Sequence, residues 1–184
     1  MNNTHEKLQR LCLAAVVAAL YTVLTLVLPM LSYGPLQVRF SEALTVLPFL
    51  FPETIPGLAV GCFLANLIGS PYPLDMVFGT LATLVAAVWT SRCRSRWFAP
   101  LPPVIANAVI IGAEIAFSSA DVGTAAFWTA WGWNAVTVGV GELLACYVLG
   151  LLLLGVLPKI PTLQKLQKQR EKAAASNQKA AAGS

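Results

Sequence analysis

A small number of ionisable and amide side chains interrupt the apolar stretches of this sequence. The densest group lies within residues 39–69, where an arginine, two glutamates and an asparagine stand among apolar residues. Charged groups are costly to bury in a membrane, so they usually face a cavity or one another and indicate a functional site by default. Arg39 and Glu42 are three residues apart and share one helix face. They can form a local ion pair, or one of them can bind a ligand.

Polar residues recur at helical spacing in two later apolar stretches. Asn107 and Glu114 are seven residues apart, so they project from one helix face with an offset of about 20°. Trp131, Asn134 and Glu142 fall within an arc of about 80° on another helix. Each residue alone can be a structural hydrogen-bonding group between helices. Several acids without matching bases, however, favour a site for a cationic or donor-rich ligand.

Asn66 and Asp75 flank a turn rich in glycine and proline and complete the predicted ligand-binding set. The set consists of Arg39, Glu42, Asn66, Asp75, Asn107, Glu114, Trp131, Asn134 and Glu142. Carboxylates accept hydrogen bonds, amides both donate and accept them, and an indole ring offers a stacking surface. These types together predict a site for a planar base, with Glu114, Asn134 and Trp131 around it. The tryptophans alone also fit an interfacial aromatic belt.

Other kinds of chemistry are excluded by the residue inventory. His5 is the only histidine, so neither a histidine metal cluster nor a serine–histidine–aspartate triad can form. The four cysteines are scattered without a CxxC motif, and we interpret them as packing residues. No glycine-rich phosphate loop is present. We therefore expect this chain to bind no cofactor or metal itself and to catalyse no reaction.

The elements that must position these side chains are expected to be membrane-spanning helices. Hydrophobic residues make up 57% of the sequence and charged residues 11%, against roughly 25% charged residues in soluble domains. A span needs about 20 apolar residues, so residues 11–158 have room for a six-helix domain. We predict an all-α integral membrane protein between a polar segment at 1–10 and a basic tail at 159–184. The expected spans are about 11–31, 40–51, 55–69, 75–91, 101–118 and 126–157.

These spans are predicted to differ in length. Residues 40–51 and 55–69 are shorter than a full crossing, so both helices are expected to be tilted or sheltered by their neighbours. Residues 126–157 exceed one crossing. Their tryptophan-rich start is therefore expected to lie at the membrane interface or to bend at Gly132.

The distribution of basic residues predicts the orientation. With six spans, both termini, the turn at 52–54 and the loop at 92–96 share one side of the membrane. That side holds eleven of the twelve lysines and arginines. Because basic loops stay in the cytoplasm, we expect both termini there. Five of the eight acids lie in the membrane or on the outer side, which places the expected site in the outer half.

The first span carries two interleaved pairs of small residues, Ala14 with Ala18 and Ala15 with Ala19. Such pairs let another helix approach closely. The approaching helix can belong to this chain or to a separate membrane subunit.

Residues 39–58, RFSEALTVLPFLFPETIPGL, closely resemble the signature of the QueT family. The resemblance is strongest over residues 38–67, continues through LDMVFGTLATLVAA at 74–87, and weakens in the last two spans. It implies a six-helix substrate-binding (S) component of an energy-coupling-factor (ECF) vitamin transporter in a bacterial plasma membrane. The family is associated with 7-deazaguanine precursors of queuosine, such as 7-aminomethyl- or 7-cyano-7-deazaguanine.

The resemblance also implies partners. An S component associates with a coupling membrane protein and with two cytoplasmic ATPases, which bind ATP and magnesium. The alanine pairs match the AxxxA pattern with which first helices of such proteins meet the coupling protein, so docking is favoured over internal packing. Membrane lipid is expected around the domain, and nucleic acid is not an expected partner.

Two alternatives stay open beside this interpretation. One is a stand-alone proton-coupled carrier that uses Glu42, Glu114 or Glu142 as a proton site. The other is an S component for a different flat, vitamin-like molecule. An intramembrane enzyme with paired carboxylates is disfavoured, because the sequence lacks a nucleophile–base pair or a metal-binding set.

Overall fold

A computed structural model describes residues 3–32, 39–168 and 170 of the 184-residue chain. These residues form helices and connecting turns, with no strand among them, so the expected all-helical class is confirmed. The helices are α1 (Asn3–Val27), α2 (Pro29–Ser32), η1 (Phe40–Phe49), η2 (Pro52–Thr54), α3 (Ile55–Gly69), α4 (Asp75–Thr90), α5 (Leu101–Ser119), α6 (Ala125–Leu143), η3 (Leu144–Gly150), α7 (Leu151–Val156) and η4 (Leu157–Lys159).

Three helical segments within the described residues are long and apolar enough to cross a membrane. They are Lys7–Val27, Leu101–Ser119 and the continuous stretch Ala125–Lys159. The other apolar helices are shorter. The composition and these three segments agree with a membrane protein.

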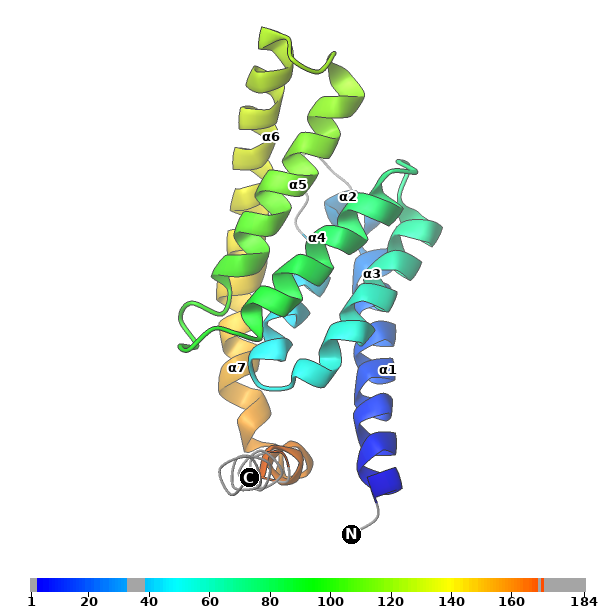
Figure 1. Cartoon of the computed structure of the whole chain (residues 1–184), viewed down its shortest axis with the longest axis vertical. Helices are drawn as coiled ribbons and strands as arrows, with labels where there is room; N and C mark the ends of the chain where they lie inside the picture. The colour runs from blue at the N-terminus through cyan, green and yellow to red at the C-terminus, as the bar shows by residue number, and fades with distance from the viewer. Residues whose placement is uncertain (1–2, 33–38, 169, 171–184) are drawn as a thin grey trace, which may run out of the picture.

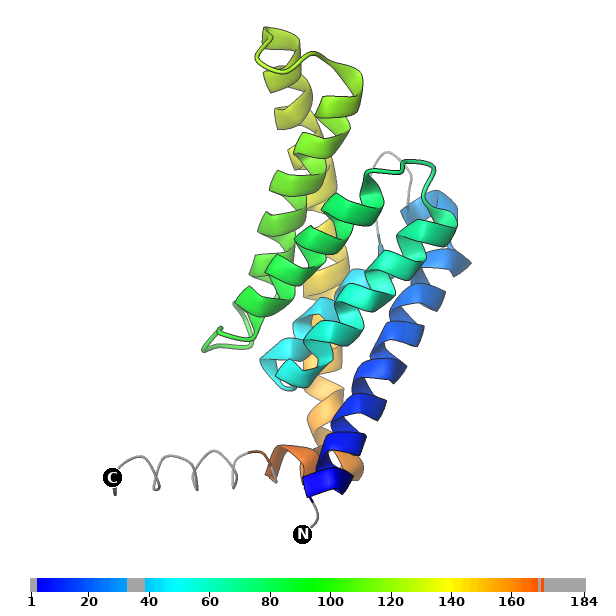
Figure 2. The ribbon, with the colours of Figure 1, turned by 45° about the vertical axis from the view of Figure 1, so that its right-hand side comes forward.

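The helices pack side by side in a row that closes around η1 (Figures 1 and 2). Helices α5 and α6 form a long antiparallel hairpin. Helix α4 packs against α5, α3 packs against α4, and α1 packs against α3. The short helix η1 contacts α1, α4 and the η3 turn, so it lies at the centre of the bundle.

Helices α1 and α3 approach each other closely because glycines face alanines. A Cβ atom at Gly57 would lie 2.2 Å from the carbonyl oxygen of Ala14, and one at Gly61 would lie 2.7 Å from that of Ala18. The hydroxyl of Thr22 strengthens the contact by donating to the carbonyl of Gly61 at 3.1 Å. Small residues therefore position α1 and α3 backbone against backbone.

Helix α1 ends at Val27, earlier than the expected end of the first span, because of a proline. Pro29 has no N–H group and cannot bond to the carbonyl of Thr25. The hydroxyl of Ser32 donates to that carbonyl instead, at 2.9 Å. The chain continues as the separate short helix α2.

Helix η1 is a 3-10 helix whose residues 41–48 are all buried. Ten residues of 3-10 helix extend over only about 20 Å, less than the roughly 30 Å of a hydrocarbon core. Pro48 cannot donate a backbone hydrogen bond within it. The hydroxyl of Thr45 bonds to the carbonyl of Glu42 at 2.5 Å, a local bond that competes with regular helix formation. η1 is therefore sheltered by its neighbours along its length.

The last long segment is helical through Gly132, so no interruption occurs there. Its winding changes later, at η3, which is a π-helix. π-Helical turns are rare and occur frequently at functional sites. The turn brings Cys146 and Gly150 into the core, where both are buried.

Candidate functional site

Seven of the nine predicted ligand-binding residues are buried, and they come from five helical segments and the Arg39 entry to η1. The seven are Arg39, Glu42, Asn66, Asp75, Asn107, Glu114 and Glu142. With the buried Tyr21 and Cys146 they form a continuous group that we call the polar core. Trp131 and Asn134 on α6 are half-buried.

One end of the polar core fixes the start of α4. The guanidinium Nη2 of Arg39 lies 3.3 Å from Oδ2 of Asp75, and its Nε donates to the carbonyl of Ser32 at 3.1 Å. Asp75 also accepts a hydrogen bond of 2.6 Å from the Ser70 hydroxyl. The amide of Asn66 donates to the backbone carbonyl of Asp75 at 2.8 Å. Arg39 thus pairs with Asp75 on another helix, a pairing that sequence spacing did not reveal.

Glu42 occupies the centre of the polar core and is 1% exposed. Its Oε1 accepts a hydrogen bond from the Tyr21 hydroxyl on α1. Thr83 on α4 and Asn107 on α5 lie beside its carboxylate. Its Oε2 has no hydrogen-bond partner among the described residues.

Glu142 lies next to Glu42 at the end of α6. The thiol of Cys146 donates to Oε2 of Glu142 at 3.6 Å and to the backbone carbonyl of Glu42 at 3.4 Å. The amide of Asn107 lies beside both carboxylates. The Nδ2 atom of Asn107 nevertheless makes no hydrogen bond to any described residue.

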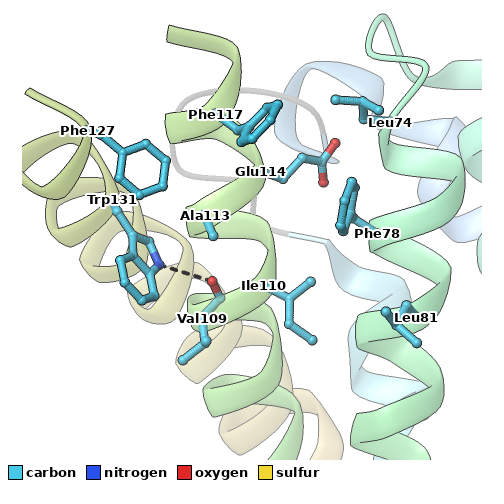
Figure 3. A pocket seen from close by; sticks show the side chains of 10 residues that line it. All are labelled: Leu74, Phe78, Leu81, Val109, Ile110, Ala113, Glu114, Phe117, Phe127 and Trp131. Atoms are coloured by element: carbon cyan, nitrogen blue, oxygen red, sulfur yellow. Dashed lines mark hydrogen bonds between the residues drawn. The ribbon is translucent and has the colours of Figure 1, made fainter. Parts of the chain in front are cut away.

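Glu114 connects the polar core to a half-open cavity of about 530 Å³ over α4, α5 and α6, several of whose lining residues, such as Val109 and Phe117, are exposed (Figure 3). The lining consists of Leu74, Phe78, Leu81, Val109, Ile110, Ala113, Glu114, Phe117, Phe127 and Trp131. The side chain of Glu114 points from α5 toward Leu74 and Phe78. Its carboxylate lies beside Asp75, and its Oε2 has no partner among the described residues. The volume falls in the range of about 300–1,000 Å³ that is typical of small-molecule sites.

Aromatic rings form the α6 side of this cavity. The indole N–H of Trp131 donates to the backbone carbonyl of Val109 at 3.1 Å, which fixes the ring against α5 (Figure 3). The ring of Phe127 lies 6.4 Å from that of Trp131. Trp133, in contrast, is 71% exposed and faces away from the core, as a residue of the aromatic belt would.

The polar core contains more acid than base. Among the described residues, Arg39 is the only buried cation, and it stands against four buried acids. Four buried side-chain atoms in the described part lack a partner, and three of them belong to Glu42, Asn107 and Glu114. A buried polar group without a hydrogen bond costs about 1–3 kcal/mol. The free oxygens of Glu42 and Glu114 are suited to a ligand that supplies hydrogen-bond donors, whereas the Asn107 nitrogen would bind an acceptor.

Sequence reasoning missed Tyr21 and Cys146. A single tyrosine in an apolar helix is typical of packing, and its bond to Glu42 depends on how α1 meets η1. Cys146 had a weak signal, because it follows Glu142 by one helical turn. Asn134 is half-buried and does not line the cavity beside Trp131.

The four alanines of the predicted docking motif separate into two pairs. Ala14 and Ala18 are buried against α3, as the glycine contacts show. Ala15 and Ala19 are exposed on α1. Ala14 and Ala18 therefore take part in packing within this chain, whereas Ala15 and Ala19 form an exposed strip of small side chains on α1.

The fold and the polar core define an α-helical membrane protein with a buried polar site beside an aromatic cavity, a plan typical of transporters. A family model described as QueT transporter matches residues 11–159. The chain belongs to this family, and the resemblance found in residues 38–67 is confirmed.

One curated relative extends the comparison. The chain is 40% identical over 73 residues to a protein of Lactococcus lactis subsp. cremoris (strain MG1363) named "Queuosine precursor transporter QueT". The match covers 39% of this chain and 43% of the relative, so it spans less than half of either protein. No solved structure matches this chain.

Proposed function

We propose that this chain is the substrate-binding membrane subunit of an ECF-type importer and that its ligand is a 7-deazaguanine precursor of queuosine. Family membership and the name of the Lactococcus relative support the substrate class. The observation that carries the assignment to a site is the unpartnered carboxylate oxygen of Glu114, which lines an aromatic cavity and lies next to a polar core with further unpartnered atoms on Glu42 and Asn107.

The proposed ligand matches the cavity in shape and chemistry. A deazaguanine base is flat and can lie against the rings of Phe78, Phe117 or Trp131. Its ring N–H and exocyclic amine are two adjacent donors. The free carboxylate oxygen of Glu114 can accept from them, and such charge-assisted bonds are stronger than neutral ones.

We further propose six membrane passes with both termini in the cytoplasm. In Figure 2 the start of α1, the η2 turn, the loop after α4 and the end of α7 lie toward the lower end. The turns at 70–74 and 120–124 lie toward the upper end. The start of α1 contains Lys7 and Arg10, and the loop after α4 contains three arginines, so the positive-inside rule supports this orientation.

The partner subunits in this proposal are a coupling membrane protein and two ATPases, which would bind ATP and magnesium. The exposed strip of Ala15 and Ala19 on α1 is the proposed contact with the coupling protein, since small residues permit close helix approach. The chain itself would bind and release the ligand without catalysis.

Reconstitution into lipid vesicles tests this function against the stand-alone carrier. We expect uptake of labelled 7-aminomethyl-7-deazaguanine only when the chain is combined with the coupling protein, both ATPases and ATP. Vesicles that hold the chain alone serve as the control. Uptake by the chain alone under a proton gradient would contradict the proposal and support a proton-coupled carrier.

A further inference from the structure

Two acids of the polar core, Glu42 and Glu142, are held together by an unusually close helix contact. A Cβ atom at Gly150 in the π-helical turn η3 would lie 2.8 Å from Cγ1 of Val46 in η1, so a larger residue there would require the Val46 side chain to shift. The same turn carries Cys146, whose thiol lies within 3.6 Å of Glu142 Oε2 and 3.4 Å of the Glu42 carbonyl. The fold thus brings the two acid-bearing segments together.

The groups around these two acids leave them short of positive charge. Tyr21 and Cys146 each give one hydrogen bond to the pair, and both are neutral donors. Arg39, the only buried cation of the described residues, forms its ion pair with Asp75 and also attracts both carboxylates, so one cation is shared by three acids. Two carboxylates in an apolar interior need a cation between them or must stay neutral.

Asn107 is the second observation that points to a ligand here. It is 3% exposed, lies beside both carboxylates, and has an amide nitrogen without a partner among the described residues. Its amide nitrogen is a donor, so Asn107 presents N–H groups to the two carboxylates, and the unpartnered acceptor of the group is Oε2 of Glu42. The carboxylate oxygens of Glu42 and Glu142 are acceptors, and a primary ammonium group carries three donors.

We propose that Glu42 and Glu142, with Asn107 as a positioning donor, form an ammonium subsite that makes this chain select a ligand with a protonated primary amine. The proposal rests on the proposed function, because it places the amine relative to the base. Asn107 and Glu114 are seven residues apart on α5, about 10.5 Å along the helix axis. A flat bicyclic base with a one-carbon amine substituent extends over a comparable length. The subsite therefore favours the aminomethyl over the cyano form, since a nitrile carries no charge and no donor.

Calorimetric binding to the purified full chain tests the subsite. We expect wild-type protein to bind 7-aminomethyl-7-deazaguanine at least about tenfold more tightly than the 7-cyano compound, as a charge-assisted bond implies. In Glu142→Gln the amine is expected to lose most of this advantage, while nitrile binding stays within about twofold. Unchanged nitrile binding also reports that the variant is folded. Glu142→Asp, which keeps the charge, is expected to retain a preference for the amine.

The outcomes separate this proposal from the one it rests on. Equal binding of both compounds by wild-type protein overturns the subsite and leaves the proposed function standing. An equal loss of affinity for both compounds in Glu142→Gln likewise overturns the subsite and leaves the proposed function standing. Glu53→Gln at the η2 turn is the matched control. Failure of wild-type protein to bind either compound overturns the proposed function and the subsite with it.

Discussion

Residues of the polar core differ in how completely their hydrogen bonds are satisfied. Arg39, Asp75 and Asn66 hold one another and the start of α4 in place. Glu42 and Glu114 each keep a buried carboxylate oxygen without a partner among the described residues. We therefore interpret the first group as positioning residues and the second group as ligand-binding residues.

Replacement of Arg39 tests the positioning role. Arg39→Met leaves Asp75 as a buried charge without its partner, which typically costs about 3–5 kcal/mol. We expect a clearly lower thermal unfolding temperature for the detergent-purified variant. The double variant Arg39→Met with Asp75→Asn should recover part of the loss, because it removes the unpaired charge. An unchanged unfolding temperature in the single variant would contradict this role.

Partners within the site depend on packing that the sequence does not encode locally. Burial of Arg39, Glu42, Glu114 and Glu142 could be predicted, because acids and arginines in apolar stretches have nowhere else to lie. The Arg39–Asp75 pair could not, since it joins residues on segments far apart in sequence. The hydrogen bond from Tyr21 to Glu42 could not be predicted for the same reason.

At the scale of helices, the lengths of the apolar stretches predicted where several helices begin and end, but they did not predict the type of helix. The expected ranges at 55–69, 75–91 and 101–118 coincide with α3, α4 and α5 to within one residue at each end. The 3-10 winding of η1 and the π-helical turn η3 were not predicted. Both depend on local competition for hydrogen bonds and on contacts with neighbouring helices, as at Pro48 and Gly150.

The contact between α1 and α3 gives a prediction at this scale. Gly57→Ala places a methyl group where the Ala14 carbonyl lies 2.2 Å away, so the two backbones must separate. We expect a loss of about 1–3 kcal/mol in the free energy of unfolding. Gly155→Ala in α7 is the matched control, because a Cβ atom there meets nothing within 4 Å. Equal unfolding temperatures for the two variants would show that the close contact is not required.

For the whole molecule, the aromatic cavity lies along the halves of α4 and α5 that are remote from the basic loop at 92–96. The cavity is lined by Leu74, just before α4, and by Phe117, near the end of α5. The basic loop at 92–96 follows the other end of α4. In the proposed orientation, a ligand that enters from outside meets the cavity before it meets the basic loop.

Labelling of single cysteines measures that orientation. In a Cys12→Ser background, we expect a membrane-impermeant maleimide to label Cys93 only after cells are permeabilised. Partial burial raises the pKa of the Cys93 thiol, so labelling is best carried out at alkaline pH. A Ser119→Cys variant, at an exposed position at the end of α5, should react in intact cells. The reverse pattern would contradict cytoplasmic termini.

The most direct test of the account is calorimetric binding of 7-aminomethyl-7-deazaguanine to the purified chain and to Glu114→Gln. Loss of a charge-assisted hydrogen bond costs about 1.5–3 kcal/mol, so we predict binding about 10–100-fold weaker in the variant. Glu53→Gln, far from the cavity, should bind like wild-type protein. Equal affinity in wild-type protein and Glu114→Gln would contradict the assignment of the ligand to this cavity.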